Sequence, residues 1–168
     1  MAINLKNWKK IGAGNYSFSK QENRIGNLRI KSSVFERKAT FEIENQVYHL
    51  KHIGFWKNNI EIVDAQGNVV LKTETEKWSS STTVIQFEEK KLNLKIRNNP
   101  LVEYAIMDGE TEILSYGLDV NDGKAATRIQ TDSNNQSYLL DFYLWYLFVP
   151  VAQENMGDDF TFLLLSTA

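Results

Sequence analysis

The chain alternates short segments of apolar and polar residues with turn-forming residues over most of its length. Nine segments have the two-residue period of half-buried strands, at residues 28–32, 40–43, 47–50, 60–63, 69–73, 83–87, 92–96, 102–106 and 113–116, and a tenth, weaker candidate lies at 124–131. Short connections rich in Asn, Asp, Gly and Glu separate them. Consecutive hairpins predict an antiparallel meander. So many strands must either pack as two sheets or close into a barrel, because long open edges invite aggregation.

An internal repeat supports this interpretation. Residues 50–70 and 94–114 align without gaps at an offset of 44, which places Ile62 on Ile106 and Asp64 on Asp108. Each copy reads as strand, loop, strand, Asp-led turn and strand, so one hairpin plan is predicted to occur twice. The alternative is that β meanders resemble one another by composition alone.

The longest apolar run, residues 138–152, shows no alternation and is longer than an ordinary strand, which favours a helix. A helix that is apolar on every face must be surrounded by protein. The run is shorter than the roughly 20 residues that span a bilayer, and Pro150 lies where the helix is expected to end or kink. We predict one domain over residues 1–168, with a lead-in at 1–15 and a central hydrophobic helix at 137–152. Residues 160–165 are either a closing strand or an extension of the same core element.

Composition removes several classes of protein. The chain has 168 residues and no Cys, so it is long enough for a core of its own, and thiol catalysis, Cys-based zinc sites and disulfide frameworks are excluded. Its N-terminal residues contain no apolar stretch of signal-peptide length, which indicates a cytoplasmic location. The aromatic content of 12% is typical of β structure.

Three passages together resemble the tubby-like barrel superfamily, which includes tubby C-terminal domains, phospholipid scramblases and LURP-one-related proteins. They are the segment 48–57 with its Gly54-Phe55-Trp56, the segment 60–70 and Trp78-Ser-Ser-Ser; Ile25-Gly-Asn-Leu28 and Lys38-Ala-Thr-Phe41 fit the leading strands. The resemblance covers roughly residues 16–152. It implies a barrel of twelve strands with a hydrophobic helix through its middle. Some members bind phosphoinositides or other membrane lipids, but their basic binding residues have no position-by-position match here.

No catalytic or metal constellation is evident. His49 and His52 are three residues apart, which on a strand sends them to opposite faces, so we expect one packed and one exposed histidine. The stretch from Asp119 resembles a calcium loop, yet its Gly arrives early and Gln130 stands where a Glu is required. The sequence therefore predicts a protein that is not an enzyme, with no cofactor and no metal.

Charge is distributed unevenly along the chain. Residues 1–38 carry nine Lys/Arg and two acids, residues 39–97 eight of each, and residues 98–168 two Lys/Arg and eleven acids, which sum to the formal charge of -2. Such asymmetry is typical of a surface for an anionic partner. Lys6 and Trp8 belong to the basic third, and the candidate ligand-binding residues are Lys9, Lys10, Arg29, Lys31, Arg37 and Lys38. The alternative is that the basic N-terminal and acidic C-terminal thirds pair with each other.

Two functions remain open. The first is a non-enzymatic barrel that binds an anionic ligand, such as a lipid headgroup or membrane surface, and so associates peripherally with a membrane. The second is a protein-interaction or scaffold domain whose aromatic residues Phe55, Trp56 and Trp78 meet a partner chain, although burial of these aromatics in the core is the favoured expectation. A carrier of a small ligand is disfavoured, because the apolar C-terminal segment should fill the barrel. No nucleic acid partner and no transmembrane segment are expected.

Overall fold

The computed structural model describes residues 4–56, 58–75, 82–98, 101–132, 137–156 and 164–166. These form an almost entirely antiparallel β structure with one helix near the C-terminus. The elements, in chain order, are β1 (Asn4–Gly12), β2 (Asn15–Lys20), β3 (Asn23–Ser32), β4 (Arg37–Ile43), β5 (Gln46–Ile53), β6 (Asn59–Asp64), β7 (Val69–Thr75), β8 (Thr82–Phe87), β9 (Lys90–Asn98), β10 (Val102–Asp108), β11 (Thr111–Asn121), β12 (Lys124–Thr131), α1 (Tyr138–Met156) and β13 (Leu164–Ser166).

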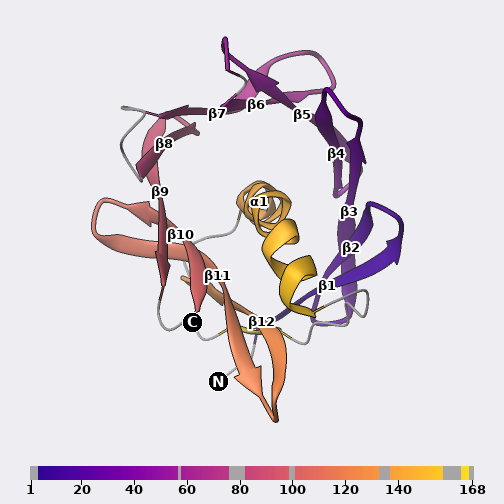
Figure 1. The fold of residues 1–168 in the computed structure, drawn as a ribbon. Coiled ribbons are helices and arrows are strands. Elements are labelled where there is room, and N and C mark those ends of the chain that lie inside the picture. The colour runs from indigo at the N-terminus through magenta and orange to yellow at the C-terminus, as the bar shows by residue number, and fades with distance from the viewer. Residues whose placement is uncertain are drawn as a thin grey trace.

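Neighbouring strands in the chain are neighbours in the sheet. The order runs from β12 down to β1 without a crossover, and the short strand β13 then adds to the free edge of β1. The sheet curls into a nearly closed barrel of twelve main strands, with α1 inside it (Figure 1). This confirms the predicted meander, its closure into a barrel and the buried helix. All ten expected strand segments fall within observed strands.

The N-terminal lead-in expected at residues 1–15 consists largely of a strand in its described part. Asn4–Gly12 is strand β1, and Asn15 already begins β2. Every second side chain of β1 and β2 is buried inside the barrel, beginning with Lys6, Trp8, Tyr16 and Phe18. A lysine at one inward position conceals the apolar alternation of β1, which is why the sequence pattern did not predict this strand.

The helix fills the middle of the barrel as a hydrophobic rod. From Leu139 to Val149 nearly every side chain is buried, including Phe142, Trp145 and Phe148. Trp8 of β1 stacks on Trp145 with ring centroids 5.3 Å apart and meets Phe142 edge-on at 4.8 Å. The aromatic core therefore forms between the first strand and the helix, which lie far apart in the sequence.

Of the two outcomes expected at Pro150, an end or a kink, the end is wrong: Pro150 lies inside α1, which continues to Met156, beyond the predicted bound of residue 152. Proline lacks the N–H that would bond to the carbonyl four residues earlier, here that of Tyr146. Arg37 supplies a substitute donor, because its Nη2 donates to the Tyr146 carbonyl oxygen at 3.2 Å. No helix in the described part of the chain has the length and apolar character needed to cross a membrane.

The internal repeat is confirmed and extends to three units. The β6–β7 ladder shifts register after Ile62, and the β10–β11 ladder shifts after Ile106, at the offset of 44 found in the sequence. The β2–β3 ladder shifts after Phe18, a further 44 residues upstream. The barrel thus consists of three four-stranded meanders, β1–β4, β5–β8 and β9–β12, each with a β-bulge at the same place in its second hairpin.

The antiparallel order sorts the connections onto two ends of the barrel. The loops after β1, β3, β5, β9 and β11 lie at one end, called here the loop end. The turns after β2, β4, β6, β8 and β10 lie at the other, called the turn end. Helix α1 starts at the turn end, where Tyr138 contacts Phe18, and finishes at the loop end, where Gln153 Nε2 donates to the hydroxyl of Tyr16.

Candidate functional site

Four of the six basic residues predicted as a binding surface lie on the outer face of the barrel. On their strands, Trp8, Leu28 and Ala39 are buried inside, so alternation turns the neighbouring positions outward. The four outward, exposed residues are Lys9 of β1, Arg29 and Lys31 of β3, and Lys38 of β4. Lys31 and Lys38 are nearest to the loop end.

Lys31 and Lys38 are direct partners across the β3–β4 ladder. Like charges that face each other on one side of a sheet destabilise the strand pair. The carboxylate of Glu36 lies 3.3 Å from the Lys38 Nζ, in an exposed ion pair that contributes little to the stability of the fold. The fold therefore places two lysines opposite each other on an exposed part of the sheet, an arrangement that does not favour the pairing of β3 with β4.

Arg37 and Lys10 lie at inward positions of the alternation and do not join this outer surface. The guanidinium of Arg37 stacks on the ring of Tyr146, with 4.2 Å between its central carbon and the ring centroid, and it also holds the Tyr146 carbonyl. Lys10 is half-buried beside Tyr16 on the neighbouring strand. Arg37 is thus a structural residue of the barrel interior.

Lys6 and Trp8, which the sequence assigned to the basic third, are buried rather than displayed. The Lys6 Nζ lies 2.8 Å from Asp141 Oδ2 and 2.8 Å from Thr131 Oγ1. Trp8 Nε1 donates to the Tyr116 hydroxyl, which donates to Asp141 Oδ1, both at 2.8 Å. Burial and the nearby Asp141 raise the pKa of Tyr116 well above its ordinary value, so the phenol stays a donor.

The two oppositely charged thirds meet at this one buried pair within the described residues. The other described ion pairs of the acidic third are made with Lys90, Arg97 and Arg128. In the described part of the chain, none of Lys9, Arg29, Lys31 and Lys38 pairs with an acid of that third. Folding therefore leaves the outer basic residues displayed.

Large apolar side chains project from two loops at the loop end. Val34 and Phe35, between β3 and β4, are 92% and 88% exposed; Phe55 and Trp56, between β5 and β6, are 90% and 81% exposed. The expectation that Phe55 and Trp56 are buried in the core is therefore wrong. Their rings touch each other edge-on at 4.9 Å. Trp78 lies outside the described residues.

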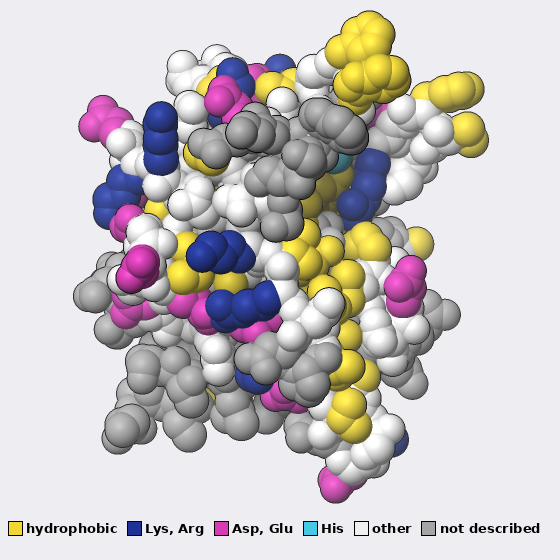
Figure 2. Space-filling model, turned by 60° about the vertical axis from the view of Figure 1, so that its left-hand side comes forward, with side chains coloured by type: hydrophobic (Ala, Val, Ile, Leu, Met, Phe, Trp, Pro, Cys, Tyr) yellow, Lys and Arg dark blue, Asp and Glu magenta, His cyan; other side chains and the backbone are white. Residues whose placement is uncertain are grey.

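The exposed apolar tips and the basic residues share one region of the barrel. Strands β3 and β4 carry Arg29, Lys31 and Lys38, and the β3–β4 and β5–β6 loops are separated by a single hairpin. Figure 2 shows hydrophobic side chains standing out at its upper right, with Lys or Arg side chains beside them. Val34, Phe35 and the exposed Lys51 of β5 were not predicted from the sequence. The signal was available in Ser32-Ser33-Val34-Phe35-Glu36, where two apolar residues interrupt a polar turn.

The turn end has a different character. The tips of its two-residue turns carry carboxylates instead of aromatics: Glu22, Glu44, Glu88, Glu89 and Glu110. One large exposed apolar residue of the described chain, Val69, lies at this end. The loop end and the turn end are thus chemically distinct faces.

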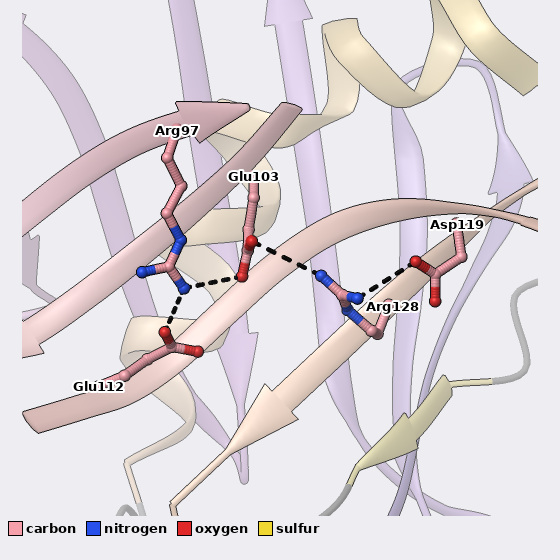
Figure 3. A network of polar contacts seen from close by, with 5 residues as sticks. All are labelled: Arg97, Glu103, Glu112, Asp119 and Arg128. Carbon is pink, nitrogen blue, oxygen red and sulfur yellow. Dashed lines mark hydrogen bonds and ion pairs between the residues drawn. The ribbon is translucent and has the colours of Figure 1, made fainter. Parts of the chain in front are cut away.

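A second polar network clamps the outer face of β9–β12 (Figure 3). Glu103 lies between two arginines, with Arg97 Nη2 at 3.0 Å and Arg128 Nη2 at 3.6 Å, while Glu112 and Asp119 bind these arginines from the far sides. Burial would raise the pKa of Glu103, but the hydrogen bond from Arg97 and the two positive charges lower it overall. Each charged group of the network has a partner of opposite sign, so the network is best understood as structural.

The histidines follow the predicted pattern. His49 points outward, with its Nδ1 3.4 Å from the Thr40 hydroxyl, whereas His52 points inward, with its Nε2 2.8 Å from the Tyr146 hydroxyl. They share no ligand. Within the described residues, no group of three or more His, Cys, Asp or Glu side chains is placed to hold a metal ion.

The helix does not fill the barrel completely. A cavity of about 900 Å³ opens at the turn end, between the first turn of α1 and the walls formed by β4–β5 and β8–β11. The expectation that the C-terminal segment leaves no room for a ligand is therefore wrong at this end.

Comparisons with protein-family models, with curated proteins and with solved structures return no match. The resemblance to tubby-like barrels stays a prediction.

Proposed function

We propose that this protein is a non-catalytic binding module that docks its loop end on an anionic membrane surface. The observation that carries the proposal is that exposed apolar loop tips lie next to an exposed basic sheet face, whose Lys and Arg residues form no ion pair with the acidic third in the described part of the chain. Aromatic and aliphatic tips insert among lipid headgroups, while Lys and Arg beside them attract anionic lipids. The proposal agrees with the resemblance to the tubby-like superfamily, some of whose members bind membrane lipids.

The apolar tips supply the part of binding that salt does not screen. Phe55 and Trp56 are already in contact and exposed, so their insertion needs no rearrangement of the core. Val34 and Phe35 lie on the adjacent hairpin and would enter the same surface. Two apolar loops side by side define a membrane-facing plane, and the polar, acidic turn end then faces away from the lipid.

The basic face supplies the electrostatic part. Each Lys or Arg near an anionic leaflet contributes about 1 kcal/mol. Lys31 and Lys38 repel each other in the free protein, and anionic headgroups between them relieve that repulsion. Arg29 and Lys9 continue the same outer face farther from the loops.

Co-sedimentation with liposomes tests the proposal. We expect binding to vesicles of phosphatidylcholine with phosphatidylserine, and weak binding to phosphatidylcholine alone. Lys31→Gln/Lys38→Gln should weaken binding to the anionic vesicles roughly 30-fold at low salt, from two contributions of about 1 kcal/mol each, and less at high salt. Phe55→Ala/Trp56→Ala should weaken binding at both salt concentrations.

Matched variants at the turn end serve as controls. Lys90→Gln/Lys91→Gln removes two exposed lysines, and Val69→Ala trims an exposed apolar residue. Both should bind vesicles like the wild type. Absence of binding to anionic vesicles at low salt would overturn the proposal. In that case, recovery of one stoichiometric protein that depends on Phe55 and Trp56 would favour the protein-interaction alternative.

A further inference from the structure

The cavity at the turn end has a mixed lining, in which apolar side chains form the inner part and polar and charged groups surround them. Its inner surface is formed by buried or half-buried side chains of four strands and the helix: Tyr48, Phe87, Leu92, Ile113, Tyr138 and Leu139. Its volume of about 900 Å³ is within the range of sites that enclose small organic ligands. The inner part of the cavity can therefore contact an apolar group, while the outer part offers polar and charged partners.

The rim of the cavity is acidic. Glu44 and Glu88 stand on the β4–β5 and β8–β9 turns, and Asp108 and Asp132 come from the ends of β10 and β12. Lys90 is the basic residue among the described lining groups, and its Nζ lies 3.6 Å from the Asp108 carboxylate. The mouth of the cavity consequently has a negative excess charge.

The start of α1 at this cavity does not reverse the sign. A helix N-terminus is equivalent to roughly half a positive charge, which is less than the excess of carboxylates on the rim. The environment of Tyr138 in the cavity is also negative. Burial raises the pKa of Tyr138, and the nearby negative charges of Glu44 and Asp141 raise it further. An anionic ligand would meet repulsion at the mouth.

We propose that this cavity binds a small organic cation with an apolar body. The apolar part lies among the aromatic and aliphatic walls, and the charged nitrogen lies at the rim beside Glu44 and Glu88. Tyr48 lines the cavity with an aromatic ring that can contact the cation as well as its hydrocarbon, whereas the Tyr138 ring already has the Lys20 Nζ 5.9 Å from its centroid. The site is at the opposite end of the barrel from the proposed membrane surface, and neither proposal depends on the other.

Three probes of equal chain length test the charge requirement: octylamine, octan-1-ol and octanoate, each titrated by calorimetry and followed by protein NMR. We expect saturable binding of octylamine, with shifts of the Leu92 and Ile113 methyl groups. Octan-1-ol should bind more weakly, and octanoate weakest of all. Equal or tighter binding of octanoate or octan-1-ol would overturn the proposal, as would the absence of saturable binding by octylamine.

A pair of charge-neutralised variants tests the site. Glu44→Gln/Glu88→Gln should weaken octylamine binding about tenfold, since each carboxylate at roughly 6 Å in water contributes about threefold. Glu22→Gln/Glu89→Gln is the matched control, because both residues are exposed on turns of the same kind but do not line the cavity. All four positions are exposed, so folding should persist, which the thermal unfolding midpoint verifies. Equal weakening in both double variants would place the probe elsewhere and overturn the proposal.

Discussion

Arg37 illustrates how one side chain can compensate for a defect in the main chain. Proline inside a helix removes a hydrogen bond and ordinarily kinks or breaks the helix. Here α1 runs through Pro150, because Arg37 reaches from β4 to the orphaned carbonyl of Tyr146 and also stacks on the Tyr146 ring. The sequence carries no signal for this contact, since 109 residues separate donor and acceptor.

A double-mutant cycle tests this role of Arg37. Arg37→Ala should lower the free energy of unfolding by about 1–3 kcal/mol, because it leaves a carbonyl without a partner. In a Pro150→Ala background the helix regains its own N–H, so the same Arg37→Ala change should cost about 1 kcal/mol less. Equilibrium unfolding in urea measures all four proteins. Equal costs in the two backgrounds would contradict the interpretation.

The exposed loop aromatics show why residue type does not decide burial. Trp8 and Trp56 are chemically identical, yet Trp8 is fully buried and Trp56 is 81% exposed. Trp8 occupies an inward position of a paired strand, whereas Trp56 follows Gly54 in a loop that leaves the sheet. The candidate site includes Trp56 because that side chain is exposed. Predicting its exposure would require knowing where the strands begin and end.

Strands β9–β12 are joined by side chains as well as by their ladders. Gly117 lies between Glu103 of β10 and Arg128 of β12 in the sheet register. A Cβ at Gly117 would approach Arg128 Nη2 to 3.2 Å and Glu103 Cγ to 3.3 Å, so a side chain there would push the two apart. The missing side chain is what lets the Arg128 guanidinium cross β11 to reach Glu103.

This clamp predicts a pH dependence of stability. The pKa of Glu103 is lowered in the folded state, so its contribution is present above its ordinary value of 4.5 and is lost as the pH falls below it. The destabilisation caused by Glu103→Gln should therefore be largest near neutral pH and shrink toward about pH 3. Glu110→Gln, in the adjacent exposed turn, is the control. A stability difference for Glu103→Gln that does not change with pH would contradict the prediction; urea unfolding over this range measures it.

Contacts between the N-terminal strand and the C-terminal part of the chain close the barrel. Strand β13 pairs with β1 through Leu5 and Leu165, and within the described residues no ladder joins β13 to β12. Lys6 crosses this region from β1 to bind Asp141 of α1 and Thr131 of β12. One buried ion pair thus ties the first strand, the last main strand and the helix together.

Breaking that pair should be far more costly than removing it. Lys6→Met leaves the Asp141 carboxylate buried without its countercharge, and a loss of about 3–5 kcal/mol in the free energy of unfolding is expected. Lys6→Met/Asp141→Leu removes both charges and should cost less than Lys6→Met alone, because no unpaired ion remains. Urea unfolding provides the energies, and near-ultraviolet circular dichroism verifies the packed core. A double variant as costly as the two single changes summed would contradict the prediction.

Much of the fold was predictable because it depends on local patterns. Alternation predicted ten strands, the absence of alternation predicted the helix, and the offset of 44 marked a unit that proves to occur three times. Strand β1 was not predicted, because Lys6 occupies an inward position. The helix continues past Pro150, because Arg37 donates a hydrogen bond to the Tyr146 carbonyl. These two exceptions each involve a partner more than 100 residues away. Strand β2 was not predicted either, although Tyr16 and Phe18 give it the alternation of a strand.

The sequence by itself determined the strand rhythm, the buried helix and a basic N-terminal third, since each follows from residue types at short separations. Only the tertiary structure decided which charges are displayed. It placed Lys6 against Asp141 in the core, turned Arg37 inward, and left Lys31 and Lys38 facing each other on the surface beside the exposed Phe55 and Trp56. The physical reason is that strand alternation and barrel closure set which side of the wall each side chain occupies. The register that governs both is fixed by contacts between distant segments.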